Sequence, residues 1–462
     1  MRILGISALD KDSTVTLVED GRIAAALSEE RLTRVKQQAW FPWRSLEKIL
    51  ADHRLTAANI DRVAFAFLPA DQEWALRKRR FKESVSFSLK HFSLGTIPHI
   101  LNFFRIIMKW TIHIKQHWAL VKGLEYYGLL NKLEYIDHHQ AHAAAAYFTS
   151  GFQECLVVTM DALGSGASGG VYLAKPETGP QLIYSVPFPH SLAIFYQRLT
   201  AALGFKPDRH EGKVLGLAAF GQPIAEYEQT KKRFIIKPGK FWFKDPMNPF
   251  YEGRLARKYK REDVAATYQK ILEEIVCEFI EYYLKKYQQQ HVALAGGLFA
   301  NVKLNQRITA LPGVKEVFIH PGMGDVGVGT GAALQVAWQN GPIASHHLEN
   351  VYLGPEYSDG EIKKTLNRHK LNYTKVNQLE KEIAELLAQG KIIGRFNGRM
   401  EYGPRALGNR SILVQAADHG INDALNKKLH RTEFMPFAPV ILIEEANKCF
   451  IGADKARHAA QF

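Results

Sequence analysis

A pattern that occurs twice constrains the fold of this chain more than any other feature. In each copy an apolar strand is followed by a short acidic or glycine-rich turn and then by a hairpin. The first copy comprises Ile3–Ala8, a turn at residues 10–13, and the hairpin strands Thr14–Glu19 and Arg22–Leu27, joined by Asp20-Gly21. The second comprises Cys155–Met160, a predicted loop at residues 161–166, and the hairpin strands Gly170–Ala174 and Gln181–Val186. Asp-Gly between alternating strands is a strong hairpin signal, and the repeat predicts two similar α/β lobes facing a cleft.

Three later loops are rich in glycine and follow predicted strands. They are Ala295–Asn301, His320–Gly329 and Asn397–Ser411. Such turns bring backbone N–H groups close to phosphate oxygens. The last loop also carries three arginines, a composition typical of a site for a phosphate-bearing ligand. An arginine-rich surface loop is the alternative.

The stretch Tyr135–Ala143 places His138 and His142 four residues apart, with His139 beside them. Positions i and i+4 share one face of a helix, so two imidazoles could hold one metal ion if a carboxylate joins them. Asp325, in a predicted strand-to-helix loop, could supply that carboxylate. The alternative is structural: Asp137 caps the helix, Asp325 caps another, and the histidines bind nothing.

Length and composition leave several classes open. The 462 residues allow two to four domains, and the net charge of +14 suits nucleic acid, an anionic membrane surface or phosphorylated small molecules. The three cysteines are far apart and form no metal or disulfide pattern, which favours a reducing cytoplasm. The N-terminus enters a strand-like run directly, so we expect no signal peptide and a cytoplasmic protein.

A basic segment at about residues 71–130 stands out. Between Asp71 and Leu130 there are ten lysines and arginines against four acidic residues. Arg105 and Lys109 interrupt its apolar run, which makes a membrane span a poor interpretation. We expect a helical insertion packed on its own domain, with peripheral membrane contact or contact with a glycan or lipid-like acceptor as the alternatives. Composition changes again near Ser345, where we place a linker at 346–359 between units at 1–345 and 360–462.

Taken in order, the motifs resemble a known family, the O-carbamoyltransferases of nodulation and of antibiotic tailoring on cephems and aminoglycosides. The matching segments are Glu29-Glu30-Arg31 with Thr33-Arg34 and Lys36, the His138/His142 helix, Asp161-Ala162 with Gly164, Gly212–Leu217, Ala295-Gly296-Gly297, Asn301 with Asn305, Gly324-Asp325 with Gly327, and Gly403–Ser411.

The resemblance implies a fold and a reaction. Residues 1–345 are expected to form duplicated actin-like/sugar-kinase (ASKHA, RNase H-like) lobes, and residues 360–462 part of a YrdC-like α/β domain. There carbamoyl phosphate and ATP would give carbamoyl-adenylate, and the cleft would transfer the carbamoyl group to a hydroxyl of a small molecule or glycan. The implied cofactor is Fe²⁺ or another divalent metal, with ATP as co-substrate.

The resemblance also implies roles for individual residues. The metal would be held by His138, His142 and Asp325. Asp161, Gly297 and Asn301 would position the carbamoyl-adenylate, Arg405 and Arg431 would bind ATP and carbamoyl phosphate, and Lys36 would stabilise developing charge.

Two features depart from the family. Lys11 stands where the family carries a histidine in His-Asp-Ser that acts on the acceptor hydroxyl. Three explanations stay open: Lys11 has a depressed pKa, His139 takes the proton, or transfer is slow. Relatives also continue beyond the Pro-Phe-Ala-Pro segment, so the YrdC-like domain is expected to be incomplete or completed by another chain.

Other functions remain as alternatives. A kinase of the same fold would produce ADP, and a non-catalytic subunit would keep the metal and nucleotide cleft without turnover. We expect no specific nucleic-acid partner. A homodimer is compatible with the sequence, which leaves the oligomeric state open.

Overall fold

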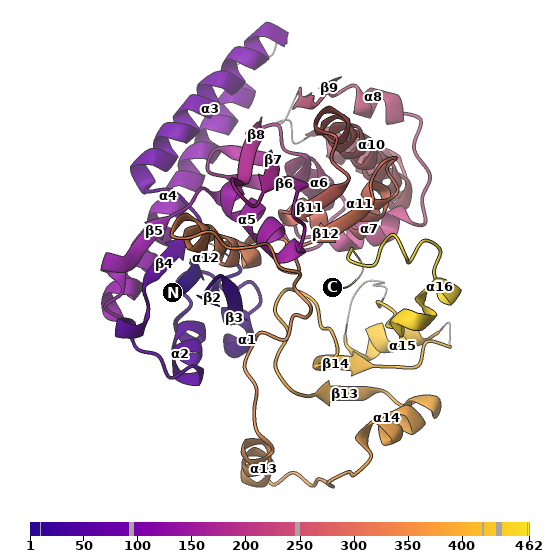
Figure 1. Cartoon of the computed structure of the whole chain (residues 1–462). Helices are drawn as coiled ribbons and strands as arrows, with labels where there is room; N and C mark the ends of the chain where they lie inside the picture. Colours follow the sequence, from indigo (N-terminus) through magenta and orange to yellow (C-terminus); the bar gives the residue numbers. More distant parts are fainter. Residues whose placement is uncertain are drawn as a thin grey trace.

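A computed structural model describes residues 1–9, 11–91, 97–244, 250–417, 420–430, 437–459 and 461. It contains two five-stranded mixed sheets and, after them, a smaller C-terminal segment (Figure 1). The α/β fold class predicted from the sequence is confirmed at this level.

The first sheet has the strand order β3-β2-β1-β4-β5. Its β1–β2 and β2–β3 pairs are antiparallel, whereas β4 and β5 run parallel to β1. The strands are β1 (Arg2–Ser7), β2 (Thr14–Glu19), β3 (Arg22–Ser28), β4 (Arg62–Phe65) and β5 (Leu133–Tyr135). Short helices on this lobe are α1 (Glu29–Thr33) and α2 (Trp43–Asp52), with 3-10 turns η1 (Ala57–Asn59) and η2 (Leu130–Lys132).

The second sheet repeats this arrangement with the order β12-β11-β6-β7-β8. Again a β6–β7–β8 meander is antiparallel and the two later strands are parallel to its first strand. The strands are β6 (Cys155–Gly164), β7 (Ala167–Lys175), β8 (Gly179–Pro187), β11 (His291–Ala295) and β12 (Glu316–Ile319). The duplication predicted from the sequence is therefore confirmed by the shared strand order and directions.

One local prediction was wrong. A loop was expected from Asp161 to Gly166, but β6 continues to Gly164. Pairing with β7 is irregular between Met160 and Gly164 and resumes where Gly164 faces Ala167. Asp161 therefore projects from a bulged strand, a local structure that re-aims side chains at functional sites.

Two helices fill the space between the sheets. They are α5 (His138–Ser150) and α12 (Val328–Gln339), and they contact each other as well as strands of opposite lobes. Both are buried nearly all round, since small residues let the backbones approach. A Cβ added at Gly331 would lie 1.7 Å from the carbonyl oxygen of Ala141. This close packing fixes α5, which carries the histidines.

Further helices cover the second sheet and build its core. They are α6 (Leu192–Ala202), α7 (Glu211–Ala218), α8 (Tyr227–Lys231), α9 (Phe250–Lys258), α10 (Arg261–Tyr287) and α11 (Val302–Thr309), with the hairpin β9 (Phe234–Lys237) and β10 (Lys240–Phe243) and the 3-10 turns η3 (Gly297–Ala300) and η4 (Asp325–Gly327). A large cluster of buried aliphatic and aromatic side chains joins α6 and α10 to this sheet.

The basic segment forms the helices α3 (Ala70–His91) and α4 (Ile97–Tyr126), as predicted. They lie beside each other and extend beyond the first sheet (Figure 1). Their sheet-proximal parts are buried, with Glu73 and His113 at most 1% exposed. None of the helices built from described residues combines the length and apolar character that crossing a membrane requires.

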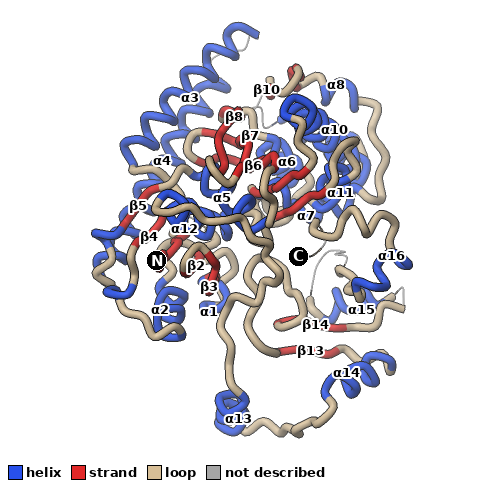
Figure 2. Tube along the Cα trace, viewed as in Figure 1, coloured by secondary structure: helices blue, strands red, loops and turns tan. Residues whose placement is uncertain are grey.

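After α12 the chain crosses a long stretch without regular structure, which Figure 2 draws in tan, and reaches α13. The later elements are α13 (Asp359–Arg368), α14 (Leu379–Ala388), β13 (Ile393–Phe396), β14 (Arg410–Leu413), α15 (Ile421–Lys428), η5 (Ile443–Glu445) and α16 (Ala446–Cys449). β13 and β14 form a separate two-stranded antiparallel sheet. The boundaries of the C-terminal unit and its likeness to a YrdC domain stay predictions.

Candidate functional site

Helix α5 begins with His138, one of the predicted metal ligands. Asp137 is the N-cap of α5, and its side chain accepts a hydrogen bond from Gln140 N at 3.0 Å. This is the capping role proposed for Asp137 as the structural alternative, but capping and metal binding use different residues. The cap fixes the start of α5, and His138 and His142, one turn apart, lie on the same face of this helix.

The ring of His138 is oriented by its surroundings. Its Nδ1 lies 3.3 Å from the carbonyl oxygen of Ala66, which suits an N–H donor at that nitrogen. Gly164 leaves room for the ring of His138, because a Cβ added at Gly164 would lie 2.0 Å from that ring. These contacts leave the Nε2 atom of His138 to face the two carboxylates described next.

Asp161 from β6 and Asp325 from η4 converge on the two imidazoles. Nε2 of His138 lies 3.0 Å from Asp161 Oδ2 and 3.7 Å from Asp325 Oδ1. Nε2 of His142 lies 3.4 Å and 3.8 Å from the same two oxygens. One ligand atom from each of these four residues lies within 4.8 Å of the others. We call them the His2Asp2 cluster.

The cluster is strongly coupled electrostatically. Burial opposes charge on His138, but the hydrogen bond to Asp161 and the charges of both aspartates outweigh it and raise the pKa of His138 to about 9. Burial also opposes ionisation of Asp161, yet His139, His138 and His142 together hold the pKa of Asp161 well below its ordinary value. The two aspartates thus favour positive charge on His138, and the histidines favour the ionised form of Asp161.

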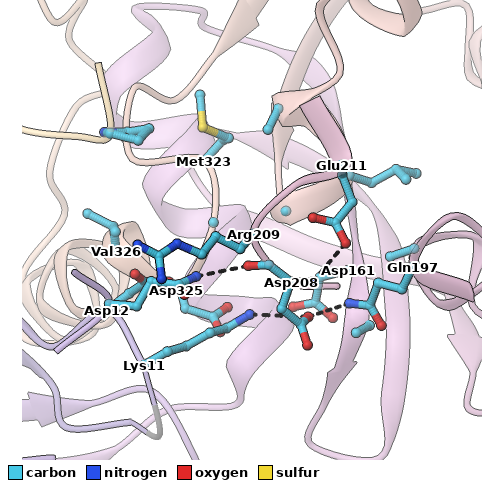
Figure 3. Close-up of a pocket in the computed structure, with 18 of the residues that line it drawn as sticks. Lys11, Asp12, Asp161, Gln197, Asp208, Arg209, Glu211, Met323, Asp325 and Val326 are labelled. Carbon is cyan, nitrogen blue, oxygen red and sulfur yellow. Dashed lines mark hydrogen bonds and ion pairs between the residues drawn. The ribbon is translucent and has the colours of Figure 1, made fainter. Parts of the chain in front are cut away.

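The cluster opens into a cavity of about 800 Å³ between the lobes and the C-terminal segment. Figure 3 shows Asp161 and Asp325 in this cavity with Lys11, Asp208, Arg209 and Glu211. The predicted site residues that line it are Lys11, Lys36, Asp161, Gly297, Asn301, Asp325 and Arg405. The cavity therefore brings together predicted site residues from both lobes and from the C-terminal segment.

Lys11 bridges the two sides of the cavity. Its Nζ lies 3.6 Å from Asp208 Oδ1 and 4.0 Å from Asp325 Oδ2 (Figure 3). Asp208 is held in turn by the side-chain amide of Gln197 and by a hydrogen bond from its own N–H to Glu211 at 2.7 Å. The Lys11 amine thus lies between a carboxylate of the cluster, Asp325, and a carboxylate of the opposite lobe, Asp208.

The other predicted residues of the N-terminal unit differ in their partners. Lys36 is mostly exposed and its Nζ lies 2.9 Å from Glu30. Gly297 faces open space, since an added Cβ would meet no atom within 4 Å. The side chain of Asn301 caps α11 and exchanges two hydrogen bonds with Gln269. Gly297 therefore offers room for a ligand, whereas much of the Asn301 amide is already used within the protein.

His139 lies behind the cavity wall. It is 2% exposed, its Nδ1 lies 3.1 Å from Thr159 Oγ1, and Nε2 lies 3.9 Å from Asp161 Oδ1. Burial lowers the pKa of His139. His139 is absent from the described residues that line the cavity, so it contacts the cluster rather than the open space.

The C-terminal segment reaches the cavity through Gly403, Pro404 and Arg405. Arg31 donates a hydrogen bond to the Gly403 carbonyl at 2.8 Å, which ties this segment to α1. The neighbouring Tyr402 hydroxyl contacts His320 and Thr330 in the core at 3.1 and 2.9 Å. Arg431 lies outside the described residues, and the adjacent His430 lines the cavity.

Sequence reasoning missed several cavity residues. Asp208, Arg209, His210 and Glu211 line the cavity directly before the Gly212–Leu217 motif. The signal was present as a run of charged residues adjoining a motif, but its side chains have no spacing that singles out one chemistry. Asp161 was predicted as a substrate contact, and the structure places it in the His2Asp2 cluster as well.

Comparison with known proteins gives matches to one family. Family models described as carbamoyltransferase N-terminus and carbamoyltransferase C-terminus match residues 2–334 and 384–461. The uncharacterized protein MJ1058 of Methanocaldococcus jannaschii is 30% identical over all of this chain and 84% of its own length. Nodulation protein NolNO of Sinorhizobium fredii is 28% identical over 95% of this chain and 63% of its length.

A third relative, nodulation protein U of Bradyrhizobium diazoefficiens, is 26% identical over 97% of this chain and 80% of its length. Among solved structures, full-length HypF in a phosphate- and nucleotide-bound form is similar with a TM-score of 0.40 and 12% identity, over 73% of this chain and 46% of HypF. The two family models together cover most of the chain. The chain belongs to the carbamoyltransferase family and is a carbamoyltransferase.

Proposed function

We propose that the protein activates carbamoyl phosphate with ATP as carbamoyl-adenylate and transfers the carbamoyl group to a hydroxyl of an acceptor. This proposal rests on one observation: residues of the predicted metal site and of the predicted phosphate-binding loop line the same cavity. The Asp161 and Asp325 side chains of the His2Asp2 cluster and the Gly403–Arg405 segment line the same cavity. A phosphate-binding arginine and a metal-type cluster in one space suit the transfer of an acyl group from a phosphorylated donor.

The residues of the cluster fit a divalent cation. Asp161 Oδ1 is buried and has no hydrogen-bond partner among the described residues, and both imidazoles present Nε2 to the carboxylates. A cation there could take the place of the proton that the aspartates stabilise on His138. His138, His142, Asp161 and Asp325 would hold it. Nitrogen and carboxylate ligands suit iron(II) and other first-row divalent metals, and a bound ion would polarise a carbonyl or phosphoryl oxygen.

The proposed reaction balances in three steps. Water converts carbamoyl phosphate to carbamate and phosphate. A carbamate oxygen then attacks the α-phosphorus of ATP, and pyrophosphate leaves with the electrons of the broken P–O bond. Finally the acceptor oxygen attacks the carbamoyl carbon, AMP leaves, and the hydroxyl proton passes to a base. In this scheme Arg405, Lys36 and Arg209 bind the anionic groups, and Lys11 stabilises charge near Asp325.

The base must reach the cavity. Lys11 is paired with Asp208 and Asp325, and His139 does not line the cavity. Glu211 does line it, and burial raises the pKa of its carboxyl, which makes the carboxylate a stronger base. We assign proton removal to Glu211. The variant Glu211→Gln should lower carbamate-ester formation at least about a hundredfold, and an unchanged rate would contradict the assignment.

The experiment incubates the protein with carbamoyl phosphate and ATP, without acceptor and with or without ferrous ion, and separates the nucleotides. The proposal predicts AMP and pyrophosphate that form only when carbamoyl phosphate is present. ADP as the product would favour a kinase of the same fold. Neither AMP nor ADP, under conditions in which ATP binds, would favour a non-catalytic subunit.

A further inference from the structure

The residues that line the cavity fall into two groups of different chemistry. We call the first group the cationic end, after the side chains that reach the cavity from the loop after α1, the loop before α7, α7 itself and the C-terminal segment, namely Lys36, Arg209, Lys213 and Arg405; the carboxylates of Glu30, Asp208 and Glu211 lie among them. The second group, which we call the apolar end, comprises Phe67, Ile112, Leu163, Phe188 and Ile194. Asp161 of the His2Asp2 cluster directly precedes Ala162 and Leu163, which also line the cavity.

The apolar end is a packed wall. Phe188 and Ile194 are 4% and 2% exposed and form a cluster with Trp74, Ala162 and Leu163. On the adjoining side, the Phe67 ring lies 5.2 Å from the His113 ring of α4 and 4.6 Å from the His138 ring. The helices α3 and α4 therefore contribute directly to the surface beside the His2Asp2 cluster.

The wall also contains buried polar side chains, since Arg77 and Gln116 line the cavity beside the apolar residues. Arg77 Nε lies 3.5 Å from Oε2 of Glu73, and these side chains are 6% and 0% exposed. Glu73 also accepts a hydrogen bond from Ser165 Oγ at 2.6 Å, and Ser165 Oγ accepts one from His138 N at 3.2 Å. The opposite charges offset each other, and the ion pair is joined to the first turn of α5.

We propose that the apolar end binds the acceptor, and that the acceptor is a neutral molecule carrying its hydroxyl on an apolar ring or chain rather than an oligosaccharide. This inference rests on the proposed function, because phosphorylated donors require the cationic end. The apolar side chains of this wall bind a matching apolar body by excluding water, whereas oligosaccharide hydroxyls packed against Phe67, Phe188 and Ile194 would lie against carbon and lose their hydration. The acceptor oxygen then lies beside Asp161, forms a bond to the carbamoyl carbon, and releases AMP.

Small-molecule pockets run from roughly 300 to 1,000 Å³, and this cavity, at about 800 Å³, lies towards the upper end of that range. The basic insertion, which forms α3 and α4, contributes wall residues such as Ile112. In this proposal these residues help to select the acceptor.

The test measures binding without turnover. The probes are 2-(2-naphthyl)ethanol and methyl glucoside, each quantified by equilibrium dialysis against the full chain. We expect the naphthyl alcohol to bind at least tenfold more tightly than the glucoside. Ile112→Lys should weaken its binding at least tenfold, because an ammonium cannot be buried against the apolar body without a partner.

The matched control is Ile114→Lys, two residues along the same helix at a side chain that is 39% exposed and does not line the cavity. It should bind the alcohol as the wild type does. A second variant, Ile112→Trp, fills the space without adding charge and should also weaken binding. Thermal unfolding of each variant confirms that it folds.

Equal binding of the two probes, or equal loss in both lysine variants, would overturn the acceptor proposal. The proposed function is judged separately, by pyrophosphate formation in the wild type. Alcohol binding without pyrophosphate would contradict the proposed function alone, and pyrophosphate without alcohol binding would contradict the acceptor proposal alone. Carbamoylated naphthylethanol, detected by mass spectrometry in the complete mixture, would support both.

Discussion

At the residue scale, the site depends on side chains whose partners lie far away in the sequence. His138 and His142 could be paired from their spacing, because the helix period places them on one face. Asp325 could be added from its loop, but its position beside them depends on the packing of two lobes. The place of Asp161 in the cluster could not be predicted, because it follows from a bulge in β6 that no pattern in the sequence indicated.

Replacement of one cluster carboxylate should weaken metal binding. Asp161→Asn removes a charge and leaves an amide beside His138 and His142, so we expect the affinity for a divalent metal to fall at least about tenfold. Metal titration by calorimetry, with iron(II) under anaerobic conditions, measures the change.

Asp208→Asn is the matched control for this prediction. Asp208 lines the same cavity and pairs with Lys11, but it is outside the His2Asp2 cluster. Its variant should keep the wild-type affinity for the metal. Equal loss of affinity in both variants would mean that the general negative charge of the cavity, rather than the cluster, attracts the ion.

Buried neutral histidines should make the protein sensitive to acid. Burial, with a contribution from Arg77, lowers the pKa of His113 to about 4, and burial lowers that of His190 to about 4. The unfolded chain therefore binds more protons than the folded one between about pH 6.5 and 4, so stability is complete above this range and falls as the pH decreases. For each of these two histidines, the unfolding free energy should be about 2 kcal/mol lower at pH 5 than at pH 7.

Urea unfolding at the two pH values measures this effect. His113→Gln should remove its share of the pH dependence, while His369→Gln, at an exposed position, should leave it unchanged. A pH dependence that survives in the His113 variant would contradict the assignment to that residue.

At the scale of elements, the site is positioned by the contact between α5 and α12. α5 carries two ligands of the cluster, and Asp325 lies in η4 directly before α12. The sequence indicated a helix at His138 and His142 and a second helix after the loop that carries Asp325. It could not predict their contact, because helices in different halves of a chain pair only through tertiary packing.

Gly331→Ala tests this contact. The new methyl group would meet the backbone of α5 at Ala141, and we expect a loss of about 3 kcal/mol or more in unfolding free energy. Gly253→Ala in α9 is the control, since the nearest atom to its Cβ would be the Arg257 side chain at 3.7 Å. Alanine favours a helix there, so this variant should be neutral or slightly more stable in urea unfolding. Similar effects of the two substitutions would contradict the close packing.

The insertion shows where sequence reasoning stopped. Its helical character and its packing on its own domain were predicted, and the structure confirms both for the described parts of α3 and α4. The cavity wall at Phe67 and Ile112 was not predicted in detail. An apolar residue that faces a cavity has the same pattern in the sequence as one that faces a core.

At the scale of the whole molecule, one cavity joins the two lobes to the C-terminal segment. Arg399 donates hydrogen bonds to the carbonyls of Ala24 and Leu353, and Glu401 accepts three from the backbone of Leu407, Asn409 and Arg410. These contacts fix the loop that carries Arg405, which lines the same cavity as Asp161 and Asp325. The duplicated lobes could be predicted from a repeated pattern, but the position of this loop could not, because no repeat links it to them.

The central claim is that one chain makes and uses carbamoyl-adenylate, and an isotope measurement tests it most directly. Carbamoyl phosphate labelled with ¹⁸O in its carbonyl group gives carbamate with one labelled oxygen of two equivalent ones. If carbamate attacks the α-phosphorus and AMP later leaves from the carbamoyl carbon, about half of the AMP should be two mass units heavier. Unlabelled AMP, or label found only in inorganic phosphate, would contradict the account.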